Sequence, residues 1–448
     1  MSLDYQPSTQ RTVSCESRPH AKIAIIGEAP GATELIKGKP FVGRAGSLLW
    51  QCSSAAQITR EMCSVHNVLD VKPKNITEFY DAKRGVFKTA AEPHLARLKE
   101  ELEQTEANVL VACGAPALAA LTGLRGITKL RGSILDKSYP GAVLRVPGRK
   151  VIPIIHPSHA LRPAAAGKFG GYLYRWAIIR DLKRVKHESA FRENRVPHRN
   201  LLMGGRCEEY LAFMNDVYEH KRPFACDIAV MNQEMSCVCV TINRQDTMVI
   251  PFTTMQNSNY FSQSEEKALI QGLARILQDP DIPKIFHNCL FDVDFFTARY
   301  GIVTQGPIHD TMILQHVTYY DMPKGLDFCV SSYCENIPYY KQERKTWKQV
   351  KDIRQLWEYN AKDGYGTWEV FENLGKESKD RGTWDTYLFC MKLVRPLLFM
   401  QRRGTKVNKK RMQGIKVELE KDMTRLQREL NELAGETINA NSPKQLAN

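Results

Sequence analysis

The chain has 448 residues, of which 43% are hydrophobic and 25% are charged. This composition is typical of a folded globular protein, and the length allows two to four domains that each bury a core. No apolar run approaches the ~20 residues that a membrane helix requires, and the start lacks a signal peptide. We therefore expect a cytoplasmic protein without a membrane partner. The net charge of +14 favours a polyanionic partner.

The twelve cysteines show no paired spacing of the kind found in disulfide frameworks or zinc sites. Cys237 and Cys239 alternate along an expected strand, so both side chains lie on one face and are predicted to be core residues. Free thiols in a reducing compartment are the simplest interpretation.

The first glycine-rich stretch follows an expected strand over residues 22–27. Glycines at this density let the backbone approach a ligand closely. The string GEAPGATELIKGKPFVGRAGSLL, which begins at Gly27, resembles the first motif of family 4 uracil-DNA glycosylases. The resemblance continues through Asn67 in NVLDVKP, a strand–glycine–helix unit at residues 109–118, and HPSHALR at residues 156–162.

The resemblance implies a pocket that reads a flipped-out base. Phe41 would stack on the uracil and the Asn67 amide would bind its edge. Glu28 would lie near the attacking water or the cationic sugar. The remaining implied roles are stabilisation of the departing uracil anion by His156, contact with the displaced strand by Arg162, and close backbone approach at Gly27 and Gly31.

The same family usually holds an iron–sulfur cluster on four cysteines. Only Cys15 precedes the first motif, Val71 stands at a usual cluster position, and the region near His94 offers no ligand. Cys52 and Cys63 are expected within helices. We therefore predict no iron–sulfur cluster. Base excision and a non-catalytic module that binds DNA or a partner both remain open for this domain.

Three carboxylates in the second half follow or interrupt apolar stretches: Asp227, Asp292 and Asp363. Such buried acids favour a divalent-metal site. Their segments resemble the three motifs of proofreading 3′–5′ exonucleases fused to family A DNA polymerases. The first motif departs from that pattern, because Ala229 stands where the family has glutamate. We favour an engineered substitution that silences the nuclease, with natural loss as the alternative that the parent gene sequence would reveal.

The resemblance implies a two-metal mechanism with Mg²⁺ or Mn²⁺. Asp227, Asp292 and Asp363 would be metal ligands. Tyr359 would orient the attacking water, and Asn288 would help to bind the substrate. Ala229 removes one ligand, so we expect the chain to bind a 3′ end but to cut it poorly. Asp310 is interpreted as a structural or outer-shell acid.

The expected fold is α/β throughout. The resemblance implies an α/β/α sandwich of the uracil-DNA glycosylase type, with a terminal helix near residues 172–186. Strands at 224–230, 236–242 and 247–252 predict an antiparallel meander, and helices near 206–219, 264–278 and 291–300 complete a ribonuclease H-like domain.

The expected boundaries are 1–188 for the glycosylase-like domain, 189–204 for a linker, 205–392 for the exonuclease domain and 393–448 for the start of a polymerase thumb. Leucines at helical spacing in 411–435 predict a long helix, with a coiled coil as its alternative. NSPKQL at residues 441–446 resembles the thumb of family A polymerases. We expect the N-terminal part of a longer phage-type replicative polymerase in the host cytoplasm, with single-stranded 3′ ends, primer-template DNA and replication proteins as partners.

Overall fold

The computed structural model describes residues 11–446 except 136–143, 145–147, 162–170, 255, 257, 338–339 and 341–351. The chain forms two compact units, Met1–Leu393 and Val394–Asn448. Among the described helices, none combines the length and the apolar character needed to span a bilayer.

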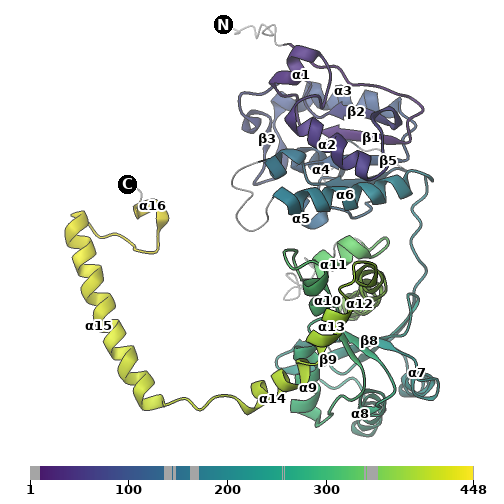
Figure 1. Cartoon of the computed structure of the whole chain (residues 1–448), viewed down its shortest axis with the longest axis vertical. Helices are drawn as coiled ribbons and strands as arrows, with labels where there is room; N and C mark the ends of the chain where they lie inside the picture. The colour runs from purple at the N-terminus through teal and green to yellow at the C-terminus, as the bar shows by residue number, and fades with distance from the viewer. Residues whose placement is uncertain are drawn as a thin grey trace. The chain divides into compact units, whose positions relative to one another are not determined.

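The first sheet of the larger unit has four parallel strands in the order β2-β1-β5-β6; strands β1, β2 and β5 are labelled in Figure 1. Every residue of these strands is buried, as expected for a parallel sheet that is covered on both faces. The strands are β1 (Ile23–Gly27), β2 (Cys63–Asn67), β5 (Val109–Cys113) and β6 (Lys150–Ile154).

Two apolar cores lie on the two faces of this sheet. One contains side chains of α2 and α6, and the other contains side chains of α3 and α4. The helices of this part are α1 (Ala32–Lys37), α2 (Arg44–Ala55), α3 (Glu92–Glu103), α4 (Ala115–Thr122), α5 (Ile127–Leu130) and α6 (Gly171–Glu188). A small hairpin, β3 (Tyr80–Asp81) and β4 (Val86–Phe87), and four 3₁₀ turns, Arg60–Met62, Ile76–Glu78, Thr89–Ala91 and Pro157–Leu161, complete it.

The second sheet has six strands in the order β12-β11-β8-β9-β10-β7, with an antiparallel β8-β9-β10 meander at its centre. The outer pairs β10-β7, β11-β8 and β11-β12 are parallel. The strands are β7 (Asn200–Met203), β8 (Phe224–Met231), β9 (Glu234–Thr241), β10 (Asp246–Pro251), β11 (Lys284–Phe286) and β12 (Ile308–Asp310).

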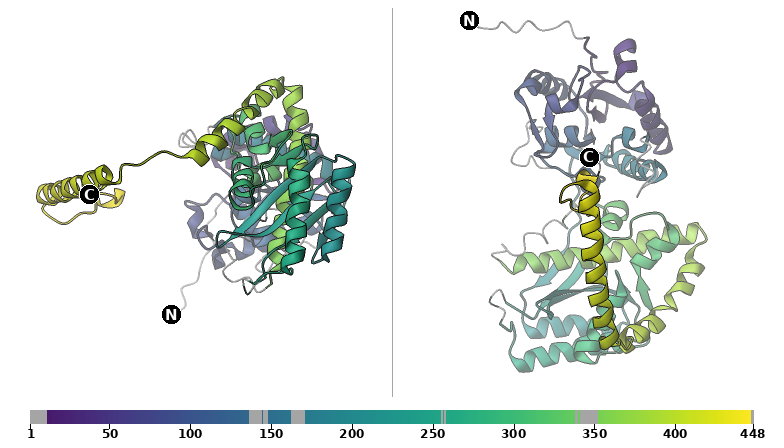
Figure 2. Two further views of the ribbon diagram at one scale, coloured as in Figure 1. Left: turned by 90° about the horizontal axis from the view of Figure 1, so that it is seen from below. Right: turned by 90° about the vertical axis from the view of Figure 1, so that its left-hand side faces the viewer.

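Helix α12 packs across one face of this sheet and contacts β8, β9, β10 and β11. Helices α7 and α8 lie side by side (Figure 2). The helices are α7 (Cys207–Glu219), α8 (Gln263–Gln278), α9 (Cys289–Tyr300), α10 (Thr311–Thr318), α11 (Leu326–Tyr333), α12 (Arg354–Asp380) and α13 (Trp384–Met391).

The predicted meander and the flanking helices are confirmed, and Cys237 and Cys239 are fully buried in one core cluster. The prediction that Cys63 lies in a helix was wrong, because Cys63 begins the buried strand β2. Residues 200–203, which the sequence placed in the linker, form β7 and extend the second sheet.

A buried ion pair lies where α6 meets α11. The guanidinium of Arg131 is 2.6 Å from the Asp181 carboxylate and donates to the hydroxyls of Ser331 and Ser332 at 3.1 and 2.7 Å. Arg131 is 2% exposed. Both Arg131 nitrogens that make these contacts donate to oxygen atoms, and this compensates the buried positive charge of Arg131.

A second set of contacts extends this interface along α6. The Arg180 guanidinium donates to both carboxylate oxygens of Glu377 on α12 at 3.1 and 2.9 Å. The Trp176 ring lies against Tyr319 and Phe328. One helix therefore contributes both to the first core and to the helical layer that follows the second sheet.

The unit Val394–Asn448 consists of α14 (Val394–Arg403), α15 (Lys409–Ala434) and α16 (Pro443–Leu446). The predicted long helix is confirmed as α15. The Asn408 side chain caps its first turn and accepts from the Arg411 backbone N–H at 3.0 Å. The leucines of α15 remain largely exposed.

Replacing Arg131 with Met should lower the free energy of unfolding by roughly 3–5 kcal/mol, because it leaves the buried Asp181 carboxylate without its partner. The double variant Arg131→Met/Asp181→Leu should recover much of this loss. Urea denaturation measures both. Arg84→Met is the control, since Arg84 is solvent-exposed. A single-variant effect no larger than the control would contradict the expectation.

Candidate active sites

The carboxyl edge of the first sheet gathers three of the predicted site residues. Gly27 ends β1, Asn67 ends its neighbour β2, and His156 follows β6 by two residues. Ligand sites of open α/β sheets form at this edge, because the loops after adjacent parallel strands converge there. Motifs that are distant in the sequence thus meet in one place.

Gly27 is the position of closest packing in this group. A Cβ atom at residue 27 would lie 2.3 Å from Asn67 Oδ1 and 2.6 Å from Phe41 Cζ. Both side chains therefore rest directly against the Gly27 backbone, and any other residue would displace them. This explains physically why a glycine ends β1.

Phe41 has a left-handed backbone, with φ of 51°. This conformation is costly for a non-glycine residue and points to a functional constraint. Two donors hold its carbonyl oxygen, Trp50 Nε1–H and Arg60 Nη1–H, each at 3.1 Å. The Phe41 ring centroid lies 6.1 Å from that of His156.

A cavity of about 320 Å³ opens between these side chains. Its lining includes Gly31, Glu34, Phe41, Asn67 and His156. It combines an aromatic face, an amide and an imidazole, which are the groups that stack on a planar base and bind its polar edge.

The tautomer of His156 follows from its contacts. The Ser158 backbone N–H donates to His156 Nδ1 at 3.2 Å, so Nδ1 carries a lone pair. The proton of the neutral ring then resides on Nε2. An Nε2–H group at this cavity is a hydrogen-bond donor for a carbonyl oxygen of a bound base.

Glu34 is a site residue that the sequence analysis missed. Its buried carboxylate accepts backbone N–H groups of Gly31, Val42 and Gly43 at 3.1, 3.2 and 2.8 Å. These bonds close the glycine-rich loop around the cavity. The signal in the sequence was weak, because a glutamate in the first turn of a short helix normally faces solvent.

The other predicted residues of this domain are placed less centrally. Glu28 is half-buried, and its carbonyl oxygen accepts the Leu69 N–H at 3.0 Å. A Cβ on Gly31 would meet Glu34 Oε2 at 2.7 Å. Arg162 lies outside the described residues.

The cysteines of this domain do not suit an iron–sulfur cluster. Cys52, Cys63 and Cys113 pack among apolar side chains in the core on one face of the sheet, whereas Cys15 lies beside His66 and Glu101. Val71, at a cluster position of the resembling family, instead forms a β-bridge with Thr12.

The second site lies where β8, α9 and α12 meet. Asp227 is on β8, and Asp292 lies in the first turn of α9. The Ile228 backbone N–H donates to Asp292 Oδ1 at 3.1 Å. Burial, followed by the nearby Asp227 charge, raises the pKa of Asp292 well above its ordinary value.

Asp363 lies on α12, one turn after Asn360, whose side chain donates to Asp227. The hydroxyl of Tyr340 donates to Asp363 Oδ1 at 2.5 Å. Tyr359, which the sequence predicted to orient water, is buried and packs edge-on against Tyr340 with ring centroids 5.4 Å apart. Tyr340 belongs to no motif, so nothing in the sequence marked it.

Asn360 is a second residue that the motifs did not reveal. Its Nδ2 donates to Asp227 Oδ2 at 2.8 Å. It precedes Asp363 by three residues, so both side chains lie on one face of α12. This helical spacing could have identified Asn360 from the sequence.

Ala229 lies two residues beyond Asp227 on β8 and faces an apolar cluster that includes Trp357 and Ala361. Trp357 Nε1 and Asn360 Oδ1 are two of the ten buried side-chain atoms without a hydrogen-bond partner in the described part of the chain. Such orphaned polar groups are uncommon in native proteins.

Asn288 and Asp310 have structural contacts. Asn288 has a left-handed backbone (φ 71°) and is the N-cap residue of α9. The Asp310 carboxylate accepts the N–H groups of Asn288 and Cys289 at 3.2 and 2.6 Å, and it also caps α10. These bonds agree with the interpretation of Asp310 as a structural acid.

The donor set of the second site suits divalent cations. Asp227, Asp292 and Asp363 come from three elements, and the latter two are buried. Asp227 and Asp292 lie close enough for the Asp227 charge to raise the pKa of Asp292, and hard oxygen ligands are those that Mg²⁺ and Mn²⁺ prefer.

These features define a protein with a uracil-DNA glycosylase-like α/β/α domain followed by a ribonuclease H-like 3′–5′ exonuclease domain. Comparison with known proteins agrees. The uracil-DNA glycosylase superfamily matches residues 16–183, and a 3′-5′ exonuclease family matches residues 207–379.

A type-4 uracil-DNA glycosylase of Thermotoga maritima is 36% identical over 152 residues, which is 33% of this chain and 70% of that protein. The chain therefore belongs, through its first domain, to the uracil-DNA glycosylase superfamily. A DNA polymerase of Bacillus phage SP01 is 22% identical over 331 residues, 67% of this chain and 33% of that protein. DNA polymerase I of Rhizobium leguminosarum is 29% identical over 185 residues, 39% of this chain and 18% of that protein.

Replacing Glu34 with Gln should lower the free energy of unfolding by about 1–3 kcal/mol, because an amide NH₂ would face a backbone donor that the carboxylate now satisfies. Urea denaturation measures the change. Glu103→Gln, at an exposed side chain, should have almost no effect. Equal stability of both variants would show that Glu34 does not hold the loop.

Proposed function

We propose that this chain is the N-terminal portion of a phage-type family A replicative DNA polymerase whose first domain excises uracil from DNA. The observation that carries the proposal is the cavity in which Phe41, Asn67 and His156 meet above the bare backbone of Gly27. A pocket built to bind the edge of one base rejects bases with the wrong donors and acceptors.

In the proposed reaction, the flipped base stacks on Phe41 and hydrogen-bonds the Asn67 amide. The bond between the sugar C1′ and uracil N1 breaks, and its electron pair leaves with the base. His156 Nε2–H stabilises the resulting anion by donating to a uracil oxygen. A water oxygen then bonds to C1′, and Glu28 would stabilise the cationic sugar or accept the water's proton.

The second domain is proposed to act on single-stranded 3′ ends and on primer-template DNA. Asp227, Asp292 and Asp363 would hold Mg²⁺ or Mn²⁺, which supplies an activated water and charge stabilisation for phosphodiester hydrolysis. Tyr359 would orient the attacking water, and Asn288 would help to bind the substrate. Two further side chains hold these acids in place. Tyr340 donates a hydrogen bond to Asp363, and Asn360 donates one to Asp227.

We further propose that Ala229 weakens this nuclease. The orphaned Trp357 Nε1–H shares an apolar cluster with Ala229 and has no acceptor among the described residues. A glutamate at position 229 would bring a carboxylate into this cluster. The unpartnered Trp357 Nε1–H therefore supports the proposal that the side chains around position 229 suit a carboxylate there.

The proposed domains are 1–188, 205–392 with β7 (Asn200–Met203) of the second sheet added to it, and 393–448 as the start of a thumb. The net charge of +14 supports DNA as the partner. Replication proteins of the host or phage are proposed as further partners.

Uracil excision should persist in EDTA, because the proposed reaction uses no metal. The assay incubates the full chain with an end-labelled single strand that carries one uracil and scores the alkali-sensitive break. Asn67→Ala should slow excision by about 10²-fold or more. The matched control Asn75→Ala removes an exposed asparagine and should keep the full rate.

An intact strand in EDTA, together with tight binding of uracil-containing DNA, would establish a binding module in place of an enzyme. Equal rates for Asn67→Ala and the control would remove Asn67 from the site.

Restoring the acid with Ala229→Glu should raise Mg²⁺-dependent shortening of a labelled 3′ end by at least about 10²-fold, since a metal ligand is worth several kcal/mol of transition-state stabilisation. Ala229→Gln has a similar size without the charge and should stay slow. Asp292→Asn should abolish the gain in the Ala229→Glu background. A wild-type chain that already cuts as fast as Ala229→Glu would contradict this proposal.

A further inference from the structure

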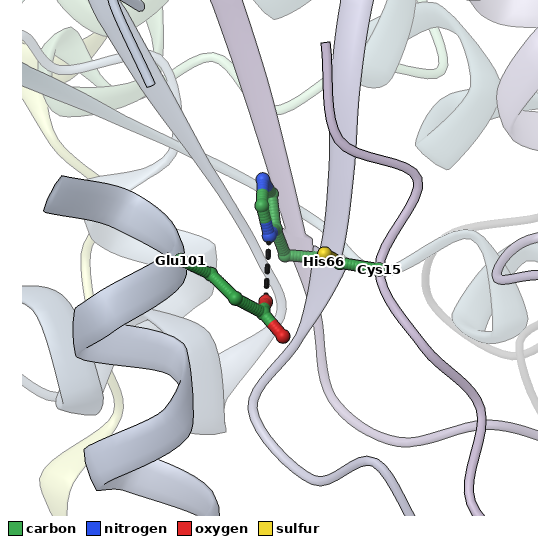
Figure 3. A group of neighbouring side chains, drawn as sticks. All are labelled: Cys15, His66 and Glu101. Atoms are coloured by element: carbon green, nitrogen blue, oxygen red, sulfur yellow. Dashed lines mark hydrogen bonds and ion pairs between the residues drawn. The ribbon is translucent and has the colours of Figure 1, made fainter. Parts of the chain in front are cut away.

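A group of three side chains with different donor atoms lies at the edge of the first sheet and shares no residue with either proposed site. Cys15 comes from the extended N-terminal segment, His66 from β2 and Glu101 from the last turn of α3 (Figure 3). A sulfur, a nitrogen and an oxygen of these residues all lie within 4.8 Å of one another. In the described part of the chain, this is the one such group of three.

The chemistry of this donor set is specific. Thiolate, imidazole and carboxylate together are the ligands of tetrahedral Zn²⁺ sites, with water at the fourth position. Mg²⁺ and Mn²⁺ prefer oxygen ligands alone. One thiolate and one carboxylate also balance the two positive charges of the ion.

The hydrogen bonds around His66 favour metal binding through Nδ1. His66 is fully buried, with Nδ1 at 2.8 Å from Glu101 Oε2 and Nε2 at 3.1 Å from Ser64 Oγ. If Nε2–H donates to Ser64 Oγ, the Ser64 hydroxyl donates in turn to the Glu16 carbonyl oxygen at 3.4 Å. The Nδ1 lone pair then faces Cys15 and Glu101, as in metal sites whose second ring nitrogen is held by a polar partner.

Hydrogen bonds from neighbouring groups also fix the positions of Glu101 and Cys15. Arg97 donates to Glu101 Oε1, the oxygen that does not contact His66. The N-terminal segment is fixed beside β2, because Glu16 and Val65 exchange backbone hydrogen bonds of 2.8 and 3.0 Å. Burial, followed by the Glu101 charge, raises the pKa of the Cys15 thiol to about 11, so a metal would have to displace its proton.

We propose that Cys15, His66 and Glu101 form a mononuclear site for a divalent transition metal, with Zn²⁺ as the preferred ion. The site fixes the N-terminal segment to β2 and α3. Because His66 directly precedes Asn67, it also stiffens the end of the strand that carries a wall of the base-sized cavity. The proposal stands whether or not the first domain excises uracil.

The test uses the full chain after removal of metals with a chelator. Titration with Co²⁺ should produce one equivalent of a tetrahedral spectrum with a thiolate-to-cobalt charge-transfer band, and Zn²⁺ should abolish that band by displacement. The band requires a sulfur ligand, so Co²⁺ at the oxygen ligands of the exonuclease site does not produce it.

Cys15→Ser should abolish the charge-transfer band, and Glu101→Gln should weaken Co²⁺ binding at least about tenfold. Cys390→Ser is the matched control, since Cys390 is also partly exposed but lies on α13. At about a hundredfold excess over the dissociation constant, Zn²⁺ should raise the unfolding midpoint by roughly 5–10 °C in the wild type and in the control.

A measurement without variants covers the case in which Cys15→Ser does not fold. Zn²⁺ should protect Cys15, mapped by mass spectrometry, from alkylation in the native wild-type chain. Absence of the charge-transfer band, a band that persists in Cys15→Ser, or unchanged alkylation of Cys15 would each overturn the proposal. Isolation of the chain with iron and acid-labile sulfide would overturn it as well.

Discussion

The first domain depends on one steric constraint, the absence of a side chain at Gly27. The 2.3 Å that would separate a Cβ atom there from Asn67 Oδ1 leaves room for hydrogen only. Asn67 and Phe41 can therefore lie against the strand end, and the left-handed backbone of Phe41 is stabilised by donors from Trp50 and Arg60. The cavity is a consequence of this packing, since its walls are the side chains that the glycine admits.

The second site depends on charge rather than on close packing, because it places carboxylates in an interior that is otherwise apolar. Asp292 and Asp363 are nearly inaccessible, and each receives a hydrogen bond from a neighbour that holds its orientation. Desolvation and the Asp227 charge both act against ionisation of Asp292. A cation bound there would offset this repulsion, with alanine at position 229 as well as with glutamate.

The motifs predicted both folds and most of the cavity residues, because glycine spacing and apolar runs with single acids are local in sequence. Tyr340, Glu34 and Arg131 were beyond that reasoning. Tyr340 approaches Asp363 across 23 residues, and Arg131 reaches the hydroxyls of Ser331 and Ser332 across about 200. Such partners depend on tertiary packing, and a lone tyrosine or arginine has no spacing that would identify them. The misplacement of Cys63 had a similar cause, since a five-residue buried strand has no periodicity that distinguishes it from a helix turn.

The packing of helix α6 limits how independently the two domains can be separated or exchanged. One of its faces completes the apolar core beside the first sheet, while Trp176 and Arg180 contact residues of the following domain. A gene fragment that ends after α6 would expose an aromatic and cationic stripe to water, so the isolated glycosylase-like domain would tend to self-associate. The two domains are thus joined by a shared surface as well as by a peptide linker, and exchange of either one in evolution would require a matching change in the other.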